Sequence, residues 1–532
     1  MERGPKTSSL FSRIDYPRQA EQTSLYDMDL DWQVCSRARL SRDARFDGKF
    51  FVGVLTTGIY CRPICRAPTA KEKNVRYFSS AAEAAEAGLR PCLRCRPECA
   101  PGTPAWLGTR STVSRALKLI GESGLEEGGI ETLAGHLGIG SRHLRRLFLR
   151  HLGATPRAVA ETRRLHFAKK LIDETSLPMN EVALAAGFGC VRRFNAGIRK
   201  VYNRTPSQIR RLARQTPAQP ENEYLFRLRF RPPYNWNGML AFLAARAIPG
   251  VETVAHGAYC RSMALNGVAG CFEISPDVLN NALIVHLRFG EPRSLFYIIE
   301  RIRAMFDLNA DWAAIIGTLR SDPMFLGPAE ANPGLRVPGC WNGFELTVRA
   351  ILGQQMTLKG AAAVAGNLVR TFGQRFPSAH GLTHLFPSPD VLADATLTGI
   401  GLPRTRADTI RALARAVCNG QLRYEGIVDA EAFLTRLREI PGIGEWTSQY
   451  VAMRALGEPD AIPSSDLALQ RALGLANSHD FAKRAEAWRP WRAYAAMYLW
   501  NIGAGMNLEA RRRTKSAAVE DSTSRHHAAA SG

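Results

Sequence analysis

The sequence predicts a multidomain α+β chain with four folded units: a small cysteine-rich domain, an all-α domain of tandem helix-turn-helix units, a small α/β sheet domain, and an all-α domain built around a helix-hairpin-helix. Three observations predict this. Two close cysteine pairs lie within the first hundred residues, and two similar pairs of amphipathic helices follow them. Beyond residue 222, strand-like alternation gives way to many short helices. At 532 residues the chain is long enough for three or more domains, each with its own core.

Linkers and tails set the expected boundaries of these units. Pro-rich joints around 99–104 and 215–220 separate the first domains, and both ends of the chain are polar and weakly patterned. We expect disordered tails at 1–30 and 509–532. We expect folded domains at 31–100 (cysteine-rich), 106–214 (helix-turn-helix), 222–310 (α/β sheet) and 325–508 (helix-hairpin-helix).

The cysteines of the first domain have the spacing of a metal site. They follow the pattern C-x3-C, a spacer and C-x2-C, at Cys61, Cys65, Cys92 and Cys95. Two close thiolate pairs joined by one loop can fold around one Zn²⁺. Most sites with four cysteine ligands serve only to stabilise a fold, so the spacing alone favours a structural zinc knuckle.

The residues around these cysteines resemble the N-terminal domain of the Ada family, the methylphosphotriester sensors of the response to DNA alkylation. The resemblance lies in residues 61–66, CRPICR, and 90–95, RPCLRC. That family uses its first zinc ligand as a methyl acceptor, and the matching residue is Cys61. Zn²⁺ keeps a thiol deprotonated at neutral pH, and the thiolate is the nucleophile such a transfer needs. The resemblance therefore implies that Cys61 is both a zinc ligand and a stoichiometric methyl acceptor.

The charge balance favours a polyanionic partner. The chain holds 70 Lys+Arg against 48 Asp+Glu, a net charge of +22, and residues 106–214 hold 20 against 8, a net charge of +12. Membrane surfaces attract the same charge, but no apolar run is long enough to span a bilayer, and the N-terminus lacks the apolar stretch of a signal peptide. We therefore expect double-stranded DNA as the partner, no membrane, a cytoplasmic location, and cysteines that are thiols or metal ligands.

Residues 106–214 contain two similar helix pairs, each followed by Thr-Pro, at 155–156 and 205–206. In each pair an Ala-rich helix, a Gly turn and an Arg-rich helix follow one another, and Ser141 is the expected N-cap of the first Arg-rich helix. This arrangement resembles the AraC-type regulator domain, which follows the zinc sensor in the Ada family. Two helix-turn-helix units in one chain remove the usual need for a dimer, so we expect a monomer.

The two Arg-rich helices are the expected recognition helices. Arginine can bond guanine edges or phosphates, whereas the alternative for any single arginine is a solvated helix face. The arginines expected to contact DNA are Arg142, Arg145, Arg192 and Arg193.

A Gly-rich turn marks the last domain. Residues 440–447, IPGIGEWT, resemble a helix-hairpin-helix, in which Gly442 and Gly444 would let backbone N–H groups approach a DNA phosphate. An ordinary turn is the alternative for this motif alone. Downstream, Asp466 stands where the glycosylase superfamily built on this hairpin carries its essential Asp. The stretch 230–505 resembles DNA-3-methyladenine glycosylase II, with matches at 232–234 (PPY), 349–354 (RAILGQ) and 488–491 (WRPW).

This second resemblance implies a monofunctional glycosylase that hydrolyses the N-glycosidic bond of alkylated bases such as 3-methyladenine. Such an enzyme flips the base into a pocket, and bond breaking builds oxocarbenium-like charge on the sugar, which a carboxylate stabilises. We assign that role to Asp466, for which a helix N-cap is the alternative. Relatives that also cleave the strand carry a Schiff-base Lys where this chain has Trp446, so strand cleavage is not expected.

The resemblance also implies an aromatic pocket for the flipped base. Electron-rich rings favour cationic alkylated purines, although aromatics at helical spacing are more often core. The family's pocket falls on Phe242, Trp446, Tyr450 and Trp500. The family fills the gap left by the base with a Leu, whereas the matching residue here is Gln355.

Together the resemblances imply a bifunctional alkylation-damage response protein. Methylation of Cys61 lowers the negative charge of the zinc site, so we expect promoter affinity to rise and transcription of repair genes to start, with RNA polymerase as a further partner. One alternative is a transcriptional activator with a catalytically inactive glycosylase half. Another is a repair enzyme that uses its helix-turn-helix units only for docking on DNA.

Overall fold

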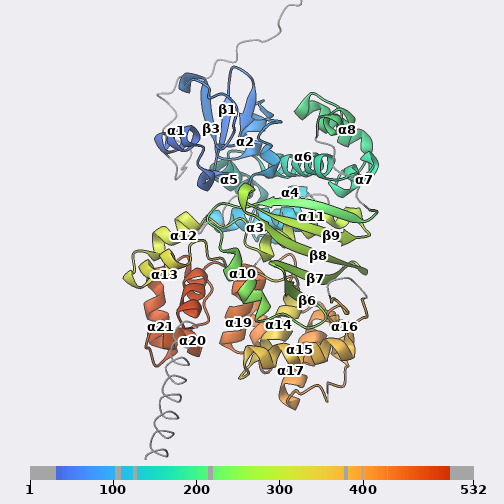
Figure 1. The fold of residues 1–532 in the computed structure, drawn as a ribbon, viewed down its shortest axis with the longest axis vertical. Helices are drawn as coiled ribbons and strands as arrows, with labels where there is room; N and C mark the ends of the chain where they lie inside the picture. Colours follow the sequence, from blue (N-terminus) through green and yellow to red (C-terminus); the bar gives the residue numbers. More distant parts are fainter. Residues whose placement is uncertain are drawn as a thin grey trace, which may run out of the picture.

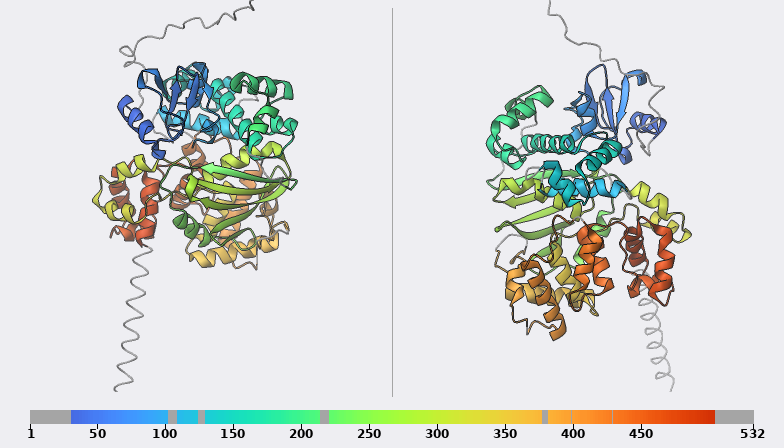
Figure 2. Two further views of the ribbon diagram at one scale, coloured as in Figure 1. Left: turned by 45° about the horizontal axis from the view of Figure 1, so that its top comes forward. Right: turned by 180° about the vertical axis from the view of Figure 1, so that it is seen from behind.

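The computed structural model describes residues 31–101, 109–123, 129–213, 220–376, 381–397, 399–427 and 429–503. The tails expected at 1–30 and 509–532, and most of the two joints, lie outside the described residues. The cysteine and helix-turn-helix domains occupy one end of the long axis, a sheet lies in the middle, and the helices of the hairpin domain form the other end (Figures 1 and 2). This order along the axis determines where the candidate sites lie.

The cysteine domain is a four-stranded sheet with short helices. The strand order is β3-β1-β2-β4, in which β1 is antiparallel to β2 and β3 and β4 is parallel to β2. Phe50, Val52 and Phe78 are buried in its core. Its elements are α1 (Trp32–Ser41), η2 (Ala44–Phe46), β1 (Phe51–Val54), β2 (Ile59–Cys61), η3 (Glu72–Asn74), β3 (Val75–Phe78), α2 (Ala81–Glu86), β4 (Arg90–Pro91) and η4 (Pro97–Cys99).

The helix-turn-helix domain is all-α, as the repeat predicts. Its elements are α3 (Thr109–Ser123), α4 (Gly129–His136), α5 (Ser141–Leu152), α6 (Pro156–Glu174), α7 (Met179–Ala185), α8 (Val191–Tyr202) and α9 (Pro206–Leu212). Thr155 and Thr205 are the N-caps of α6 and α9. The expected Ser141 cap was wrong, because Gly140 already has the extended backbone of an N-cap and Ser141 is the first helical residue.

The sheet domain consists of five antiparallel strands with helices packed against them. The strand order is β5-β9-β8-β7-β6. The predicted alternation is observed in β5, where Phe226 and Leu228 are buried and Arg227 is exposed. Its elements are β5 (Glu223–Arg229), α10 (Trp236–Ala244), β6 (Glu252–Ala255), β7 (Ala258–Leu265), β8 (Val268–Asp277), η5 (Val278–Asn280), β9 (Ala282–Phe289), η6 (Pro292–Ser294) and α11 (Leu295–Met305).

The hairpin domain packs many short helices around one apolar core. Helix α12, which the sequence left between the two C-terminal domains, contributes Ile315 and Leu319 to this core, and α13 contributes Ala329. No helix among the described residues is both long and apolar enough to cross a membrane. The elements are α12 (Trp312–Leu319), η7 (Pro323–Phe325), α13 (Leu326–Ala331), α14 (Gly343–Gly353), α15 (Leu358–Phe372), α16 (Pro389–Ala393), α17 (Arg404–Cys418), α18 (Ala430–Arg438), α19 (Glu445–Val451), the π-helix η8 (Ala452–Leu456), α20 (Leu467–Ala472), α21 (Ser478–Ala485), η9 (Glu486–Trp488) and a helix over 492–503.

Candidate functional sites: a cysteine centre and a carboxylate in an aromatic cluster

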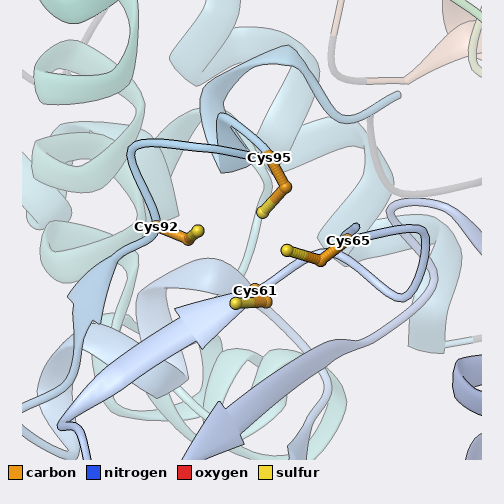
Figure 3. A group of neighbouring side chains, drawn as sticks. All are labelled: Cys61, Cys65, Cys92 and Cys95. Carbon is orange, nitrogen blue, oxygen red and sulfur yellow. The ribbon is translucent and has the colours of Figure 1, made fainter. Parts of the chain in front are cut away.

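The four predicted cysteines converge on one point. Their sulfur atoms all lie within 4.8 Å of one another, and Figure 3 shows the side chains pointing toward a common centre. Cys61 ends β2 and Cys92 follows β4, so the parallel pairing of these strands sets the two cysteine pairs side by side. The peptide N–H of Cys92 donates to the Tyr60 carbonyl at 2.9 Å and fixes this register.

The chemistry of this centre fits Zn²⁺. Its donors are four thiol sulfurs, a set that suits Zn²⁺ and not the oxygen-seeking Mg²⁺ or Ca²⁺. Backbone N–H groups of Arg62 and Ala67 donate to the sulfurs of Cys95 and Cys65 at 3.3 and 3.5 Å. Such bonds stabilise negative charge on sulfur. None of the eleven cysteines forms a disulfide, as expected.

A buried arginine adjoins the centre. The guanidinium of Arg62, only 2% exposed, is paired with the carboxylate of Asp47, and its Nε donates to Asp47 Oδ1 at 2.8 Å. The same guanidinium donates to the carbonyl oxygen of Cys95 at 3.1 Å. A fixed positive charge therefore lies beside the anionic ligand set, and the loops of Cys61 and Cys95 are held together by it.

The predicted catalytic carboxylate lies at the start of a helix, where its oxygens accept four hydrogen bonds. Asp466 is the N-cap of α20, and its Oδ1 accepts from the N–H groups of Ala468 and Leu469 at 2.9 and 3.0 Å. The indole N–H of Trp446 donates to Oδ2 at 2.8 Å, and that of Trp500 donates to Oδ1 at 3.3 Å. Asp466 is therefore both the N-cap of α20 and a hydrogen-bond acceptor for two of the predicted pocket aromatics.

The four predicted pocket aromatics lie in one neighbourhood. The rings of Trp446 and Tyr450 stack with centroids 5.1 Å apart and planes at 9°, and Trp500 meets Tyr450 edge-on at 6.4 Å. Phe242 lies beyond Tyr450, with the guanidinium of Arg454 near both rings, 4.8 Å from Phe242 and 5.3 Å from Tyr450. We refer to these four aromatics together as the aromatic cluster.

Two arginines that contact the aromatic cluster were missed by sequence reasoning. Arg246 lies 3.7 Å over the ring of Phe242, and Arg454 donates to the hydroxyl of Tyr450 at 2.5 Å. The only signal was spacing, since each arginine follows its aromatic by four residues, Arg454 within the helical segment of Tyr450 and Arg246 in the turn after α10. Burial raises the pKa of Tyr450, but the two guanidiniums outweigh burial and hold that pKa below its ordinary value.

The hairpin turn and the expected wedge are neighbours. Gly442 has φ +91°, and a Cβ there would come within 2.3 Å of Thr409 Oγ1, so the turn requires glycine. The side chain of Gln354 donates to the Gly442 carbonyl at 3.0 Å. Gln355, the next residue, is exposed and left-handed at φ +55°. Gly444 is exposed with open space around it.

Family models match four successive parts of the chain. They are the metal binding domain of Ada over residues 34–98, a helix-turn-helix domain over 133–212, the AlkA N-terminal domain over 225–342, and the HhH-GPD superfamily base excision DNA repair protein over 348–491. The matched order is the order predicted from the sequence.

One curated relative matches the chain over nearly its whole length, and others match its two halves separately. The chain is 38% identical over 481 residues to "Probable bifunctional transcriptional activator/DNA repair enzyme AlkA" of Mycobacterium tuberculosis, covering 88% of this chain and 96% of that protein. The chain belongs to this AlkA family of bifunctional proteins. Its C-terminal half is 35% identical to DNA-3-methyladenine glycosylase 2 of Escherichia coli, covering 52% of this chain and 96% of that protein. Its N-terminal part is 39% identical to the bifunctional transcriptional activator/DNA repair enzyme Ada of E. coli, covering 24% of this chain and 34% of that protein.

Membership of the AlkA family confirms the four-part fold and the Ada-type zinc domain. It leaves the individual site residues as predictions. The arginines expected to contact DNA lie on the outer faces of α5 and α8, whose inner faces bury residues such as Leu144, Phe148, Phe194 and Ile198. Arg142, Arg145, Arg192 and Arg193 are all exposed.

Proposed function

We propose that the chain is a DNA alkylation-response protein with two chemistries: a monofunctional DNA glycosylase that releases alkylated bases, and a sensor that accepts a methyl group from DNA methylphosphotriesters and then activates transcription. The observation that carries the glycosylase is the Asp466 carboxylate, held by two indole N–H groups inside an aromatic cluster. A carboxylate in that setting suits the stabilisation of a cationic sugar.

In the glycosylase reaction, the N-glycosidic bond breaks, the base departs with the bonding electrons, and water adds to C1′ of the sugar. The proton that the water loses passes through Asp466 to solvent, or to the base where the base leaves as an anion. Asp466 stabilises the positive charge that develops on the sugar. Within the described residues Oδ2 accepts one hydrogen bond and Oδ1 accepts three, so Oδ2 has the larger share of unused lone-pair density. We therefore assign Oδ2 as the atom that faces the sugar and the attacking water.

The aromatic cluster binds and orients the flipped base. Trp446 and Tyr450 already stack on one another, so a base stacks on an outer ring face of the pair and not between them. Arg246 and Arg454 add positive charge to the same walls. That charge opposes a cationic base, which the ring faces attract, but it stabilises the negative charge on a neutral base as it leaves.

In the sensor, the sulfur of Cys61 attacks the methyl carbon of a methylphosphotriester. The S–C bond forms, the O–C bond breaks, and the phosphate leaves as an ordinary phosphodiester anion. Zn²⁺ on the four sulfurs supplies deprotonation of the thiols. Among the described residues no backbone N–H donates to the Cys61 sulfur, whereas Cys65 and Cys95 each receive one. Cys61 is therefore a less stabilised and more nucleophilic thiolate than those two.

The regulator completes the proposal. Exposed arginines on α5 and α8 bind promoter DNA once methylation has reduced the negative charge of the cysteine centre. Activation of transcription implies contact with RNA polymerase in the cytoplasm, and tandem helix-turn-helix units allow the chain to act as a monomer. A catalytically inactive glycosylase half is disfavoured, because the carboxylate and both of its indole donors are present and correctly bonded.

One experiment tests both chemistries in the same samples. The wild type and Asp466→Asn are incubated with methylated duplex DNA, and released 3-methyladenine and S-methylation of Cys61 are measured together. We expect release to be lost in the variant while Cys61 is still methylated. Release by neither protein would favour the activator with an inactive glycosylase half, and methylation at another cysteine would reject Cys61 as the acceptor.

A further inference from the structure

The two DNA-facing surfaces of the proposed function lie in opposite halves of the molecule. The operator surface consists of Arg142 and Arg145 on α5 and Arg192 and Arg193 on α8. The lesion surface consists of Gln355, Gly442, Gly444 and Asp466. Figure 1 and the views in Figure 2 place α5 and α8 in one half of the long axis and α19 and α20, which follow the hairpin and Asp466, in the other half.

The five-stranded sheet separates the two surfaces. Its strand order, β5-β9-β8-β7-β6, runs along the long axis (Figure 1). The β5 edge meets the helix-turn-helix domain, since Lys170 of α6 donates to the Arg227 carbonyl at 2.7 Å. The other edge meets the hairpin domain, since the N–H of Thr383 donates at 2.8 Å to the carbonyl of Gly250, just before β6.

The width of this spacer has an electrostatic consequence. Five strands about 4.8 Å apart span about 19 Å, which exceeds the Debye length of about 8 Å at physiological salt. DNA on the operator surface therefore exerts little repulsion on DNA at the lesion surface.

Buried polar contacts fix the two halves relative to one another. Arg231, 1% exposed, follows β5 and donates to the Asp47 carbonyl at 2.9 Å and the Asn309 carbonyl at 2.6 Å, so it joins the cysteine domain to the C-terminal half. Lys49 and Asp311 form a buried ion pair at 2.5 Å across the same junction. Separating the halves would break all of these contacts at once.

A third contact strengthens the junction on the side of the helix-turn-helix domain. Arg163 of α6 pairs with Glu300 of α11 at 2.6 Å, and both side chains are mostly buried. With the halves fixed in this way, the molecule does not fold over to bring both surfaces onto one short stretch of DNA.

We infer that one copy of the chain binds two DNA segments at the same time: a promoter duplex on the operator surface and a damaged duplex on the lesion surface. This inference rests on the proposed function of both ends and adds their simultaneous occupancy. The chain then excises bases while it remains on its promoter, and it tethers damaged DNA to the site of transcription activation.

The test uses two separate short duplexes, one for each surface. One is selected from a random pool by the methylated protein and carries a fluorophore. The other carries a single pyrrolidine abasic analogue, which mimics the cationic sugar, and a second fluorophore. Mass photometry and two-colour correlation then count the duplexes on each protein copy. We expect a complex of one protein and two duplexes, and a dissociation constant for the lesion duplex that changes less than twofold when the operator duplex is saturating.

Two surface variants assign each duplex to its end. Arg142→Ala with Arg145→Ala should remove the operator duplex only. Gly444→Asp should weaken the lesion duplex only, because it places a carboxylate where a phosphate approaches, and the added Cβ meets open space and leaves the fold intact. If the operator duplex instead competes with the lesion duplex, the inference is overturned while both proposed activities stand. If either duplex fails to bind by itself, the proposed function of that end fails.

Discussion

Replacement of Asp466 by Asn tests the glycosylase chemistry with little damage to the fold. The side-chain oxygen of Asn can take the place of Oδ1, keep both backbone N–H bonds of α20, and serve as an equally good N-cap. Its NH₂ group then takes the place of Oδ2 and opposes the Trp446 N–H, so one charge-assisted hydrogen bond is lost. That loss costs about 1.5–3 kcal/mol of stability.

The loss in rate should be larger than the loss in stability. The variant removes the negative charge that stabilises the cationic sugar. Removal of one preorganised group from a comparable site lowers the rate of the chemical step about 100- to 1,000-fold. Single-turnover release of 3-methyladenine, with protein in excess, measures this step directly. Thermal unfolding of the same samples shows whether the fold persists.

Asp429→Asn is the matched control. Asp429 caps α18 with the same kind of side-chain bond, to the Ala432 N–H at 3.0 Å, but among the described residues it forms no hydrogen bond with the aromatic cluster. It should lose neither activity nor more than about 1 kcal/mol of stability. Release by Asp466→Asn within about threefold of the wild type would refute the electrostatic role assigned to this carboxylate.

Four further predictions follow from the sites. Cys61→Ala should abolish methyl transfer, whereas Cys92→Ala, which also removes one zinc ligand, should retain part of it in zinc-loaded protein. Mass spectrometry of the methylated cysteine peptide distinguishes loss of the acceptor from loss of a ligand. Arg454→Met should raise the release of cationic 3-methyladenine relative to neutral hypoxanthine, because one guanidinium leaves the aromatic cluster, and an unchanged ratio would contradict the charge argument. Gln355→Leu should tighten binding to a duplex with an abasic analogue, since an apolar side chain fills the gap in the stack better than an amide, and gel-shift titration measures the change. Burial lowers the pKa of His166 to about 4, below an unfolded value of about 6.5, so the stability that depends on a neutral His166 is complete above pH 6.5 and is lost as the pH falls toward 4. In His166→Gln the free energy of unfolding should change less with pH between 6.5 and 4, which denaturant titrations at a series of pH values measure.

The sequence predicted those parts of the fold that rest on local pattern. Alternation placed β5 and β9, and the repeated Gly turns placed both helix-turn-helix units. The Ser141 cap was wrong by one residue because both Gly140 and Ser141 can serve as an N-cap, and the choice depends on backbone angles that composition does not set. The cysteine centre was predicted because ligand spacing constrains it directly.

Contacts between distant segments could not be predicted in this way. Arg231 and Asp47 are 184 residues apart, and nothing in either segment indicates that they meet across a domain junction. The fixed junction, and with it the separation of the two DNA-facing surfaces, is therefore a result of the structure alone.

The arginines of the aromatic cluster show how such a contact changes the chemistry inferred from sequence. The aromatic residues alone favour cationic bases, because ring faces attract positive charge. In the structure, Arg246 and Arg454 already occupy ring faces of Phe242 and Tyr450, so part of that attraction is satisfied by the protein. A cationic lesion loses its glycosidic bond readily and needs little help, whereas a neutral base leaves as an anion and gains from these charges. We therefore expect the arginines to shift the preference of the proposed glycosylase toward neutral lesions, relative to a pocket of aromatic rings alone.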